Sequence, residues 1–356
     1  MNAALVAALG LLVQQPAIAS GFSVPEVSAL GTATANALVA NPEEKGAFPF
    51  NPAAMGFHDD SSLSLGTLFI GPSFNVRTAN GSFDSNSADW VVAPMIQAAI
   101  KINEQWRAGL GLNAPFGLET RWREGTFPAL SGSTPRAIAP GVVVPIPNGN
   151  QPTQSKLEIL DFVPTATYKV NDSFSVAAGL DLYWAKSAVL NSSLGELNGD
   201  GTGIGFNAGL LYRRDALSLG ASYHSSATLS IEGPYSPLNT LLVVAGGLAP
   251  GQPAKVDLDL PWRLQLGVRY EVNDELAVEF DWTRSGWSKF DKLTVKGRRT
   301  GEVIFTDTNA WDDADAYRIG MTYQLRPATQ LRLGYAYDET GQQDDHFSAR
   351  VPDNDR

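Results

Sequence analysis

The sequence predicts an all-β fold in which antiparallel strands form a transmembrane β-barrel, and three observations support this prediction. Apolar and polar residues alternate along extended segments, short and long connections follow one another in turn, and no segment after the N-terminus is apolar enough for a membrane-spanning helix. Alternation with a period of two is typical of strands with one apolar face. Because lipid offers no hydrogen-bond partners, a sheet that crosses a membrane has to close into a barrel.

Residues 1–19 predict an export signal. An apolar run from Ala3 to Val13 precedes Ala17-Ile18-Ala19, a small-x-small cleavage pattern. The run is too short to cross a bilayer as a helix, and a buried N-terminal helix is the alternative. We therefore expect residues 1–19 to be the signal peptide of an exported protein.

Residues 58–356 predict the barrel wall. Alternation is clearest at 174–184, 262–270, 276–283 and 331–337. Strands that cross a membrane at a tilt need about 9–11 residues, which is longer than the usual strand of a soluble sheet. The pattern predicts eleven strands and the beginning of another at 346–356. Because bacterial barrels have an even number of strands, we expect the last strands to be missing from this sequence.

The connections between these strands alternate in length. Tight turns are expected at Asn103-Glu104, Asn171-Asp172, Arg213-Asp215, Asn273-Asp274 and Arg326-Ala328. Long links are expected at 77–87, 116–155, 188–202, 232–254, 292–309 and 339–345. A transmembrane barrel has short periplasmic turns and long external loops, which explains the alternation. A soluble lectin or jelly roll is the alternative architecture, but it gives no reason for this pattern.

The composition excludes several classes of protein. The chain has no cysteine, so it can form neither a disulfide framework nor a thiolate site. Its formal net charge of −11 provides no basic surface for nucleic acid. The three histidines are not in metal-ligand spacing, and a barrel phospholipase built around His224 is only a weak alternative. We predict a protein that is not an enzyme and has no catalytic residues, cofactor, metal site or nucleic-acid partner.

Several short motifs resemble one known family, in that family's order along the chain. They are Gly21-Phe22, Asn51-Pro52-Ala53, Pro115-Phe116-Gly117-Leu118-Glu119-Thr120, Trp287-Ser288-Lys289-Phe290, Asp315-Ala316-Tyr317-Arg318-Ile319-Gly320 and Pro352-Asp353-Asn354-Asp355-Arg356. Together they resemble the outer-membrane transporters of long-chain fatty acids and aromatic hydrocarbons, the FadL/TodX type (OMPP1). No single one of these motifs would be sufficient, but together they span nearly the whole mature chain.

The resemblance implies a barrel of fourteen strands whose lumen holds an N-terminal plug, or hatch, at residues 20–57. About eleven to twelve of those strands are expected here, because the Pro352–Arg356 run enters the twelfth strand of the family. A flexible periplasmic tail is the alternative for residues 20–57. The implied location is the outer membrane of a Gram-negative bacterium, where a monomer contacts lipid and lipopolysaccharide.

The resemblance also implies candidate ligand-binding and gating residues. In the family, a kink in the third strand opens the wall sideways, and Pro and Gly here suit such a kink because Pro lacks a ladder donor and Gly permits a bend. The alternative is that the strand simply ends there and an external loop begins. The candidates for gating and for the kink are Gly21, Phe22, Asn51, Pro52, Ala53, Asn113, Pro115, Phe116 and Gly117.

Two further groups of residues are candidates for ligand contact. Leu238, Leu241 and Leu242 lie in an expected external loop, where apolar residues predict a capture groove or, alternatively, a cap of loops packed on each other. Inward-facing charges form the second group, because an Arg such as Arg318 could pair with a substrate carboxylate. A structural lattice of ion pairs is the alternative. The other members of this group are Arg263, Arg269, Glu279, Asp281 and Arg332.

The function that the resemblance implies is uptake of hydrophobic small molecules by passive diffusion through a plugged barrel, with a lateral exit. The fatty-acid transporter of the family has a Lys beside the Asp-Ala-Tyr-Arg run. Here that place is Ala314, which fits an uncharged hydrocarbon slightly better than a fatty acid. A general porin and a structural or adhesive barrel are the alternatives.

Overall fold

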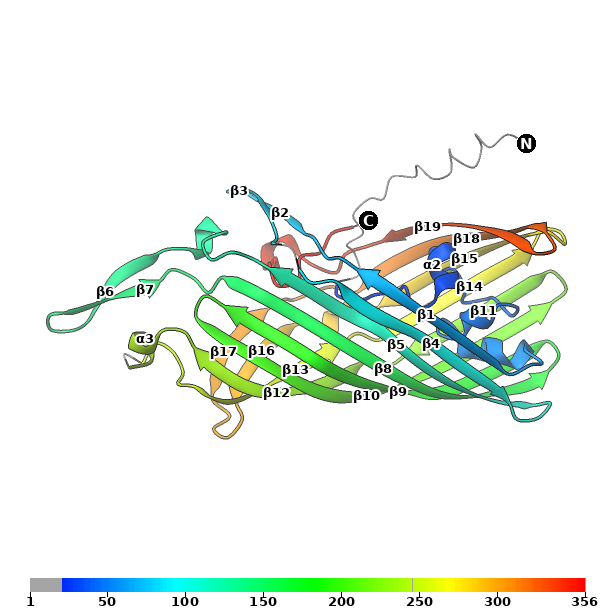
Figure 1. Cartoon of the computed structure of the whole chain (residues 1–356), viewed down its shortest axis with the longest axis horizontal. Coiled ribbons are helices and arrows are strands. Elements are labelled where there is room, and N and C mark those ends of the chain that lie inside the picture. The colour runs from blue at the N-terminus through cyan, green and yellow to red at the C-terminus, as the bar shows by residue number, and fades with distance from the viewer. Residues whose placement is uncertain (1–20, 87, 245, 356) are drawn as a thin grey trace.

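The computed structural model describes residues 21–86, 88–244 and 246–355, and the expected signal peptide therefore lies outside the described residues. Long tilted strands curve around one axis to form an elongated barrel (Figure 1). In the described part of the chain, eleven antiparallel strands follow one another along the wall, which confirms the number predicted before the last link. They are β1 (Ser62–Ile70), β4 (Val91–Lys101), β5 (Trp106–Arg121), β8 (Pro152–Asn171), β9 (Phe174–Ser192), β10 (Gly195–Arg214), β11 (Leu217–His224), β14 (Arg263–Glu271), β15 (Leu276–Ser285), β18 (Ala314–Arg326) and β19 (Thr329–Asp338).

The wall is extended at one end by further strands and hairpins, while short turns join the strands at the other end (Figure 1). The extension of the main sheet consists of β12 (Ala227–Pro237), β13 (Gln252–Leu260), β16 (Lys292–Gly297) and β17 (Val303–Thr308). Separate hairpins are β2 (Asn75–Thr78) with β3 (Gly81–Asp84), and β6 (Ser133–Ala139) with β7 (Val142–Pro147).

The helices are short. They are α2 (Ala29–Ala33), α3 (Thr240–Val244) and the 3-10 turns η2 (Lys45–Ala47), η3 (Pro52–Phe57), η4 (Pro128–Leu130), η5 (Trp287–Lys289) and η6 (Asp344–His346). Throughout the described ranges, no helix has both the length and the apolar character needed to cross a membrane.

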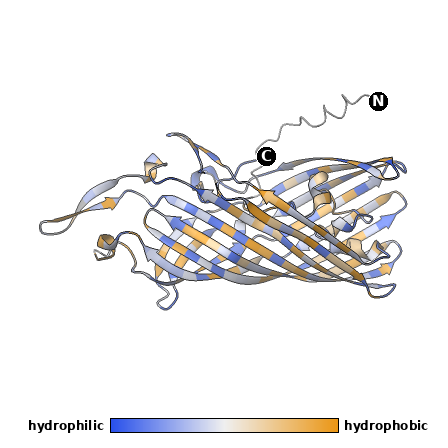
Figure 2. Ribbon diagram, in the orientation of Figure 1, coloured by the Kyte–Doolittle hydropathy of each residue, from blue (hydrophilic) through white to orange (hydrophobic). Residues whose placement is uncertain are grey.

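Hydrophilic and hydrophobic residues are interspersed along the wall strands (Figure 2), and the exposures of their side chains place them on opposite faces, as the alternation predicts. On β14, Val268 and Tyr270 point outward and are 45% and 53% exposed, whereas the intervening Arg269 points into the lumen and is 5% exposed. The same arrangement recurs on β15, where Phe280 is exposed and Asp281 is buried. An apolar outer face and a polar interior are what a strand between lipid and a filled lumen requires.

The external end is more ordered than the sequence suggested, and the expected long link at 188–202 is wrong. β9 and β10 run through this range, with Asn198 opposite Val189, and only Ser193 and Leu194 connect them. The ranges 232–254 and 292–309 likewise contain paired strands. Strands that continue beyond the lipid no longer need an apolar outer face, so the alternation fades although the backbone pairing continues.

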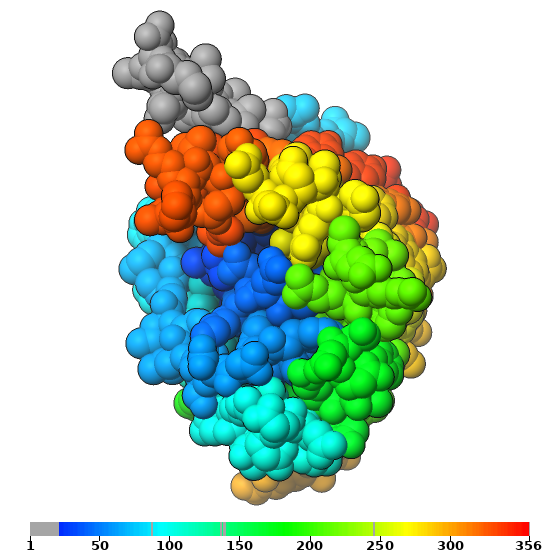
Figure 3. Space-filling view, turned by 90° about the vertical axis from the view of Figure 1, so that its right-hand side faces the viewer, coloured from blue at the N-terminus to red at the C-terminus, as the bar shows by residue number. Residues whose placement is uncertain are grey.

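Residues 21–57, called here the N-terminal segment, lie in the lumen. In the end-on view its atoms fill the centre of the ring of wall strands (Figure 3). Helix α2 begins after Ser28, whose Oγ accepts a hydrogen bond from the Gly31 amide at 3.0 Å. Val39 and Phe50 of the segment form one buried cluster with Leu211 of β10. Because the inner face of the wall is mostly polar, the segment supplies much of the apolar packing at this level.

Candidate transport pathway

A belt of wall glycines lets the backbone of the N-terminal segment lie directly against the barrel. A Cβ atom on Gly220 would be 2.0 Å from the carbonyl oxygen of Val39, and one on Gly334 would be 2.2 Å from the carbonyl carbon of Thr34. Side chains at these positions would therefore push the segment away from the wall. The glycine belt consists of Gly209, Gly220, Gly267, Gly320 and Gly334, on β10, β11, β14, β18 and β19.

Two inward carboxylates fasten the same part of the segment. The amide of Val39 donates to Oδ2 of Asp281 at 3.0 Å, and the amide of Ala40 donates to Oε1 of Glu279 at 2.7 Å. Both carboxylates are buried. The two neighbouring backbone amides of the segment thus find their acceptors on β15, which fixes this part of the segment to the wall.

The Asn51-Pro52-Ala53 motif joins the segment to the wall through its polar atoms. Asn51 is buried, and its Nδ2 donates to the carbonyl oxygens of Val39 at 2.8 Å and Leu210 at 2.9 Å. Its Oδ1 accepts from the Ala53 amide at 3.1 Å, which caps η3. The Asn51 side chain thus holds the segment's own turn and the barrel strand together.

The backbone of the motif is bound by wall hydroxyls. Thr167 donates to the Pro52 carbonyl at 2.9 Å, and Ser175 donates to the Ala53 carbonyl at 2.6 Å. Just beyond the motif, the His58 carbonyl accepts from Nε of Arg107 at 3.0 Å. Burial lowers the pKa of the His58 imidazole, which is therefore neutral at pH 7.

The inward arginines that face the segment are paired. Arg318 Nη2 lies 2.6 Å from Oδ1 of Asp338, and Arg332 Nη2 lies 2.6 Å from Oε1 of Glu44. Of the two interpretations of the inward charges, the geometry of Arg318 favours the lattice of ion pairs, because a ligand carboxylate would have to compete with Asp338. Within the described ranges, no cluster of three or more His, Asp or Glu side chains is arranged to hold a metal ion.

We predict that adding one methyl group at Gly220 loosens the N-terminal segment. Gly220→Ala places a carbon atom 2.0 Å from the Val39 carbonyl oxygen, far inside van der Waals contact, and overpacking of this kind costs about 1–3 kcal/mol. Hydrogen exchange at the Val39 and Ala40 amides should become faster. Gly66→Ala is the matched control, because its nearest neighbour would be 3.5 Å away. Unchanged protection of the two amides in Gly220→Ala would contradict the close fit.

The wall has a gap between β4 and β5. Pairing between these strands ends at Ile96 and Leu112. Beyond this point β4 continues to pair with β1 as far as Val91, while β5 continues to pair with β8 as far as Arg121. The two neighbouring strands therefore separate although each keeps its other partner.

A bulge in β5 lies at the edge of this gap. Asn113 pairs with Asp161 and Phe116 pairs with Ile159, so β5 has one more residue than β8 between these pairs. Pro115 lies in this stretch and has no amide to donate. The sequence left open whether the strand kinks or ends here, and the backbone continues past an irregularity. A bulge bends its strand away from the sheet, which explains the separation from β4.

The first described residues of the chain pair with β5 at this bulge. The Val24 amide donates to the Pro115 carbonyl at 2.8 Å, and the Gly117 amide donates to the Phe22 carbonyl at 2.8 Å. An open cavity of about 400 Å³ lies beside this contact. Apolar side chains of four strands line it, among them Leu68, Ile70, Val92, Phe116, Leu118 and Leu160.

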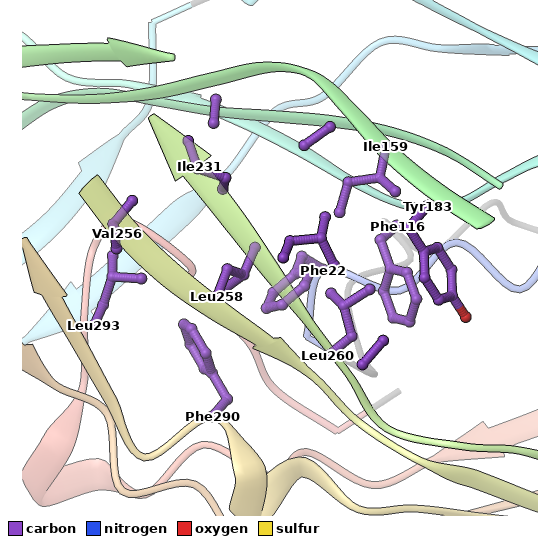
Figure 4. Close-up of a cluster of buried hydrophobic side chains, with 14 of the residues drawn as sticks. Phe22, Phe116, Ile159, Tyr183, Ile231, Val256, Leu258, Leu260, Phe290 and Leu293 are labelled. Carbon is purple, nitrogen blue, oxygen red and sulfur yellow. The ribbon is translucent and has the colours of Figure 1, made fainter. Parts of the chain in front are cut away.

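Phe22 occupies the centre of a buried aromatic cluster (Figure 4). Its ring centroid is 4.9 Å from that of Trp287, 5.3 Å from that of Phe290 and 5.8 Å from that of Phe116. Gly21 precedes it with a φ of +65°, a conformation that suits glycine. The aromatic contact partners Trp287 and Phe290 were missed as site residues by sequence reasoning, although the motif that contains them was recognised.

A second cavity of about 60 Å³ lies on the other side of Phe22. Ile231 on β12, Val256 and Leu258 on β13 and Leu293 on β16 line it. Because these strands belong to the external extension of the sheet, the cavity continues the lumen toward the external end. Phe22 lines this external cavity, while its neighbours Gly21 and Ser23 line the cavity beside the gap, so the two cavities meet at the start of the N-terminal segment.

The candidate residues of the external loop differ in their exposure. Leu238 and Leu241 are 55% and 62% exposed, whereas Leu242 is buried. They lie in and before α3, beyond the ends of the wall strands (Figure 1). Two of the three predicted residues are thus available at the surface, and the third packs beneath them.

The comparisons with known proteins agree with this architecture. Residues 10–356 match the model of the family described as outer membrane protein transport protein (OMPP1/FadL/TodX). The long-chain fatty acid transport protein of Escherichia coli O6:H1 is 24% identical over 401 residues, which cover 100% of this chain and 85% of that protein.

Two solved structures share the fold. A FadL homologue of Pseudomonas aeruginosa has a TM-score of 0.75 and 21% identity, with 94% of this chain and 85% of that chain covered. The toluene transporter TbuX of Ralstonia pickettii has a TM-score of 0.68 and 19% identity, with coverage of 90% and 87%. The match of the family model over nearly the whole sequence establishes that this chain, an outer-membrane β-barrel of a Gram-negative bacterium, belongs to the OMPP1/FadL/TodX family of transport proteins.

Proposed function

We propose that this protein takes up hydrophobic small molecules across the outer membrane by passive diffusion and releases them sideways through its wall. The observation that carries the proposal is the gap between β4 and β5, because an apolar cavity of about 400 Å³ lies directly beside it. A molecule that dissolves poorly in water gains nothing from a route into the periplasm. An exit into lipid keeps it in an apolar environment throughout.

The axial route is closed by the N-terminal segment. Its backbone lies against the glycine belt and is fastened by Asp281 and Glu279. In our proposal residues 20–57 act as the plug of a barrel formed by residues 58–356, after a signal peptide at 1–19. In our proposal the lateral route needs a smaller rearrangement, because the contacts of residues 21–24 with β5 lie at the edge of the gap.

The proposed path begins at the exposed leucines of the external loop, Leu238 and Leu241. It continues into the apolar cavity lined by Ile231 and Val256 and reaches the aromatic ring of Phe22. Movement of Gly21 and Phe22 then joins this cavity to the one beside the gap. No energy source or cofactor is required, since the ligand moves down its concentration gradient.

The proposed substrates are long-chain fatty acids or aromatic and alkane hydrocarbons. The support comes from the relatives, which are named for long-chain fatty acids in one case and for toluene in another. We further propose that the protein works as a monomer, with lipid and lipopolysaccharide around its apolar outer face. A general porin is the alternative that needs an experimental distinction.

The test is uptake by Gram-negative cells that express the chain in a strain without any transporter of this family. Labelled oleate and toluene should accumulate faster than in cells with an empty vector, while labelled arabinose should not. Rates equal to those of the empty vector for both hydrophobic compounds would contradict the proposal. Faster entry of arabinose would favour the porin.

A further inference from the structure

A small chamber with a mixed polar and apolar lining lies on the inner side of the aromatic cluster. Its volume is about 40 Å³, and it is bounded by Phe116 and Trp287 on the side of the cluster. Its charged and imidazole side chains are Asp161 on β8, His224 on β11 and Arg263 on β14, and further polar side chains are Ser23, Asn113, Tyr183, Asn207 and Ser285. A water-sized group needs about 10–15 Å³ of such volume, so the chamber can hold a small polar group.

Five residues that line the chamber each carry a buried polar atom without a hydrogen-bond partner in the described part of the chain. Buried polar groups are nearly always hydrogen-bonded in native proteins, and each exception requires an explanation. Because all five residues line one cavity, a polar group bound there could pair with several of these atoms at once. They are Asp161 Oδ1, Asn207 Oδ1, His224 Nε2, Arg263 Nε and Trp287 Nε1.

These atoms include both acceptors and donors. The amide oxygen of Asn207 can only accept, and the carboxyl of Asp161 offers acceptor oxygens, whereas the nitrogens of Arg263 and Trp287 can only donate. Among the described residues, the Arg263 guanidinium has no carboxylate oxygen within 4.0 Å, although Asp161 faces the same chamber. A group that fills the chamber well therefore has to donate and accept hydrogen bonds at once.

Three classes of head group can be compared on this basis. A hydrocarbon would leave all five atoms without a partner. A carboxylate could accept from Arg263, but it would meet the carboxylate of Asp161, and Asp181 lies just behind, where its Oδ2 is 3.0 Å from Nδ1 of His224. A hydroxyl group donates one hydrogen bond and accepts up to two, so it suits both sides of the chamber without adding charge.

We propose that this chamber is a specificity site for a hydroxyl head group, and that the protein takes up uncharged hydrophobic alcohols or phenols. The proposal rests on the uptake function described above. The aliphatic or aromatic part of such a ligand would lie among Phe22, Phe116 and Trp287. Phe116 borders both the chamber and the cavity beside the gap, so the head group is held next to the lateral exit.

The test compares three labelled ligands with the same twelve-carbon chain, namely 1-dodecanol, dodecane and dodecanoate. Their dissociation constants are measured for the full chain in lipid nanodiscs, and binding to empty nanodiscs is subtracted. A site that hydrogen-bonds a hydroxyl group discriminates strongly against an analogue without one, so the alcohol should bind at least about tenfold more tightly than the alkane. Arg263→Met should remove this preference, so that the dissociation constants for dodecanol and dodecane become equal within about twofold.

Gln265→Met is the matched control. Gln265 is the next inward residue on β14 and is also buried, but it does not line the chamber, so the preference for the alcohol should remain. Arg263→Lys keeps the positive charge and loses the Nε donor, and it should give an intermediate preference for the alcohol. It provides a second test in case the methionine variant does not assemble correctly.

Each other outcome is decisive. Equal affinity of the wild-type chain for dodecanol and dodecane would mean that water alone fills the chamber, and tightest binding of dodecanoate would mean an anion site. Either result overturns the hydroxyl proposal, as would a preference that survives Arg263→Met. Failure of the wild-type chain to bind any of the three ligands would instead count against the uptake function itself.

Discussion

Removal of the bulge in β5 should abolish uptake of hydrophobic molecules while the barrel still assembles. Deleting Ala114 gives β5 and β8 equal numbers of residues between the pairs Asn113–Asp161 and Phe116–Ile159. Combining the deletion with Pro115→Val restores the missing amide. A strand without the bulge can continue to pair with β4, and the gap then closes. Uptake of oleate and toluene should fall to the rate of cells without the protein.

The control for this change keeps the bulge and alters only its side chain. Ala114→Gly leaves the count of residues unchanged, so uptake should stay close to that of the wild type. The amount of folded barrel in the membrane has to be equal in both variants, which a heat-modifiability gel can establish. Normal uptake by the deletion variant would mean that ligands leave by another route, and the lateral exit would have to be abandoned.

Replacement of Asn51 should loosen the N-terminal segment and let polar solutes through. Asn51→Leu leaves the Val39 and Leu210 carbonyls and the Ala53 amide without their partner. Each buried polar group left unpaired costs about 1–3 kcal/mol, so the segment should lose roughly 3 kcal/mol or more of its attachment. Cells that express this variant should become sensitive to large hydrophilic antibiotics that the wild-type chain excludes.

Asn198→Leu is the matched control, because Asn198 is exposed on the outer face of β10. Antibiotic sensitivity should not change in this variant. Hydrogen exchange in residues 34–41 offers a second measurement, and it should become faster only in Asn51→Leu. If the permeability of both variants equals that of the wild type, the plug is held mainly by its apolar packing and not by the Asn51 side chain.

Much of the wall could be predicted from the sequence because each strand faces lipid on one side only. Each residue meets either lipid or the lumen regardless of which strand pairs with its own. The result is a period-two pattern that can be read from one strand alone, as in Val268, Arg269 and Tyr270. The prediction of a long link at 188–202 failed because this signal depends on lipid. Once the strands extend beyond the lipid, nothing forces an apolar outer face, and the pattern disappears while the backbone hydrogen bonds remain.

The candidate pathway depended far more on contacts between distant parts of the chain. Pro115 indicated an irregularity, but only the pairing of β5 with β8 and not with β4 revealed a gap. Phe22 was identified by resemblance alone, and its neighbours Trp287 and Phe290 lie more than 260 residues further along the sequence. No local sequence pattern predicts the contact of Phe22 with these two residues, because the contact depends on how the wall curves.

The sequence by itself predicted an exported chain. It also determined that the chain is β-stranded and that the strand face that meets lipid is apolar, because these two properties follow from the solvent around each residue. Only the tertiary structure decided which inward polar side chains have a hydrogen-bond or ion-pair partner and which do not. Arg318 and Arg263 occupy equivalent inward positions in the sequence pattern, yet Arg318 is paired with Asp338, whereas Nε of Arg263 has no hydrogen-bond partner among the described residues. The difference is one of distance in space, because hydrogen bonds and ion pairs form only between atoms that the curved wall and the N-terminal segment bring within a few ångströms.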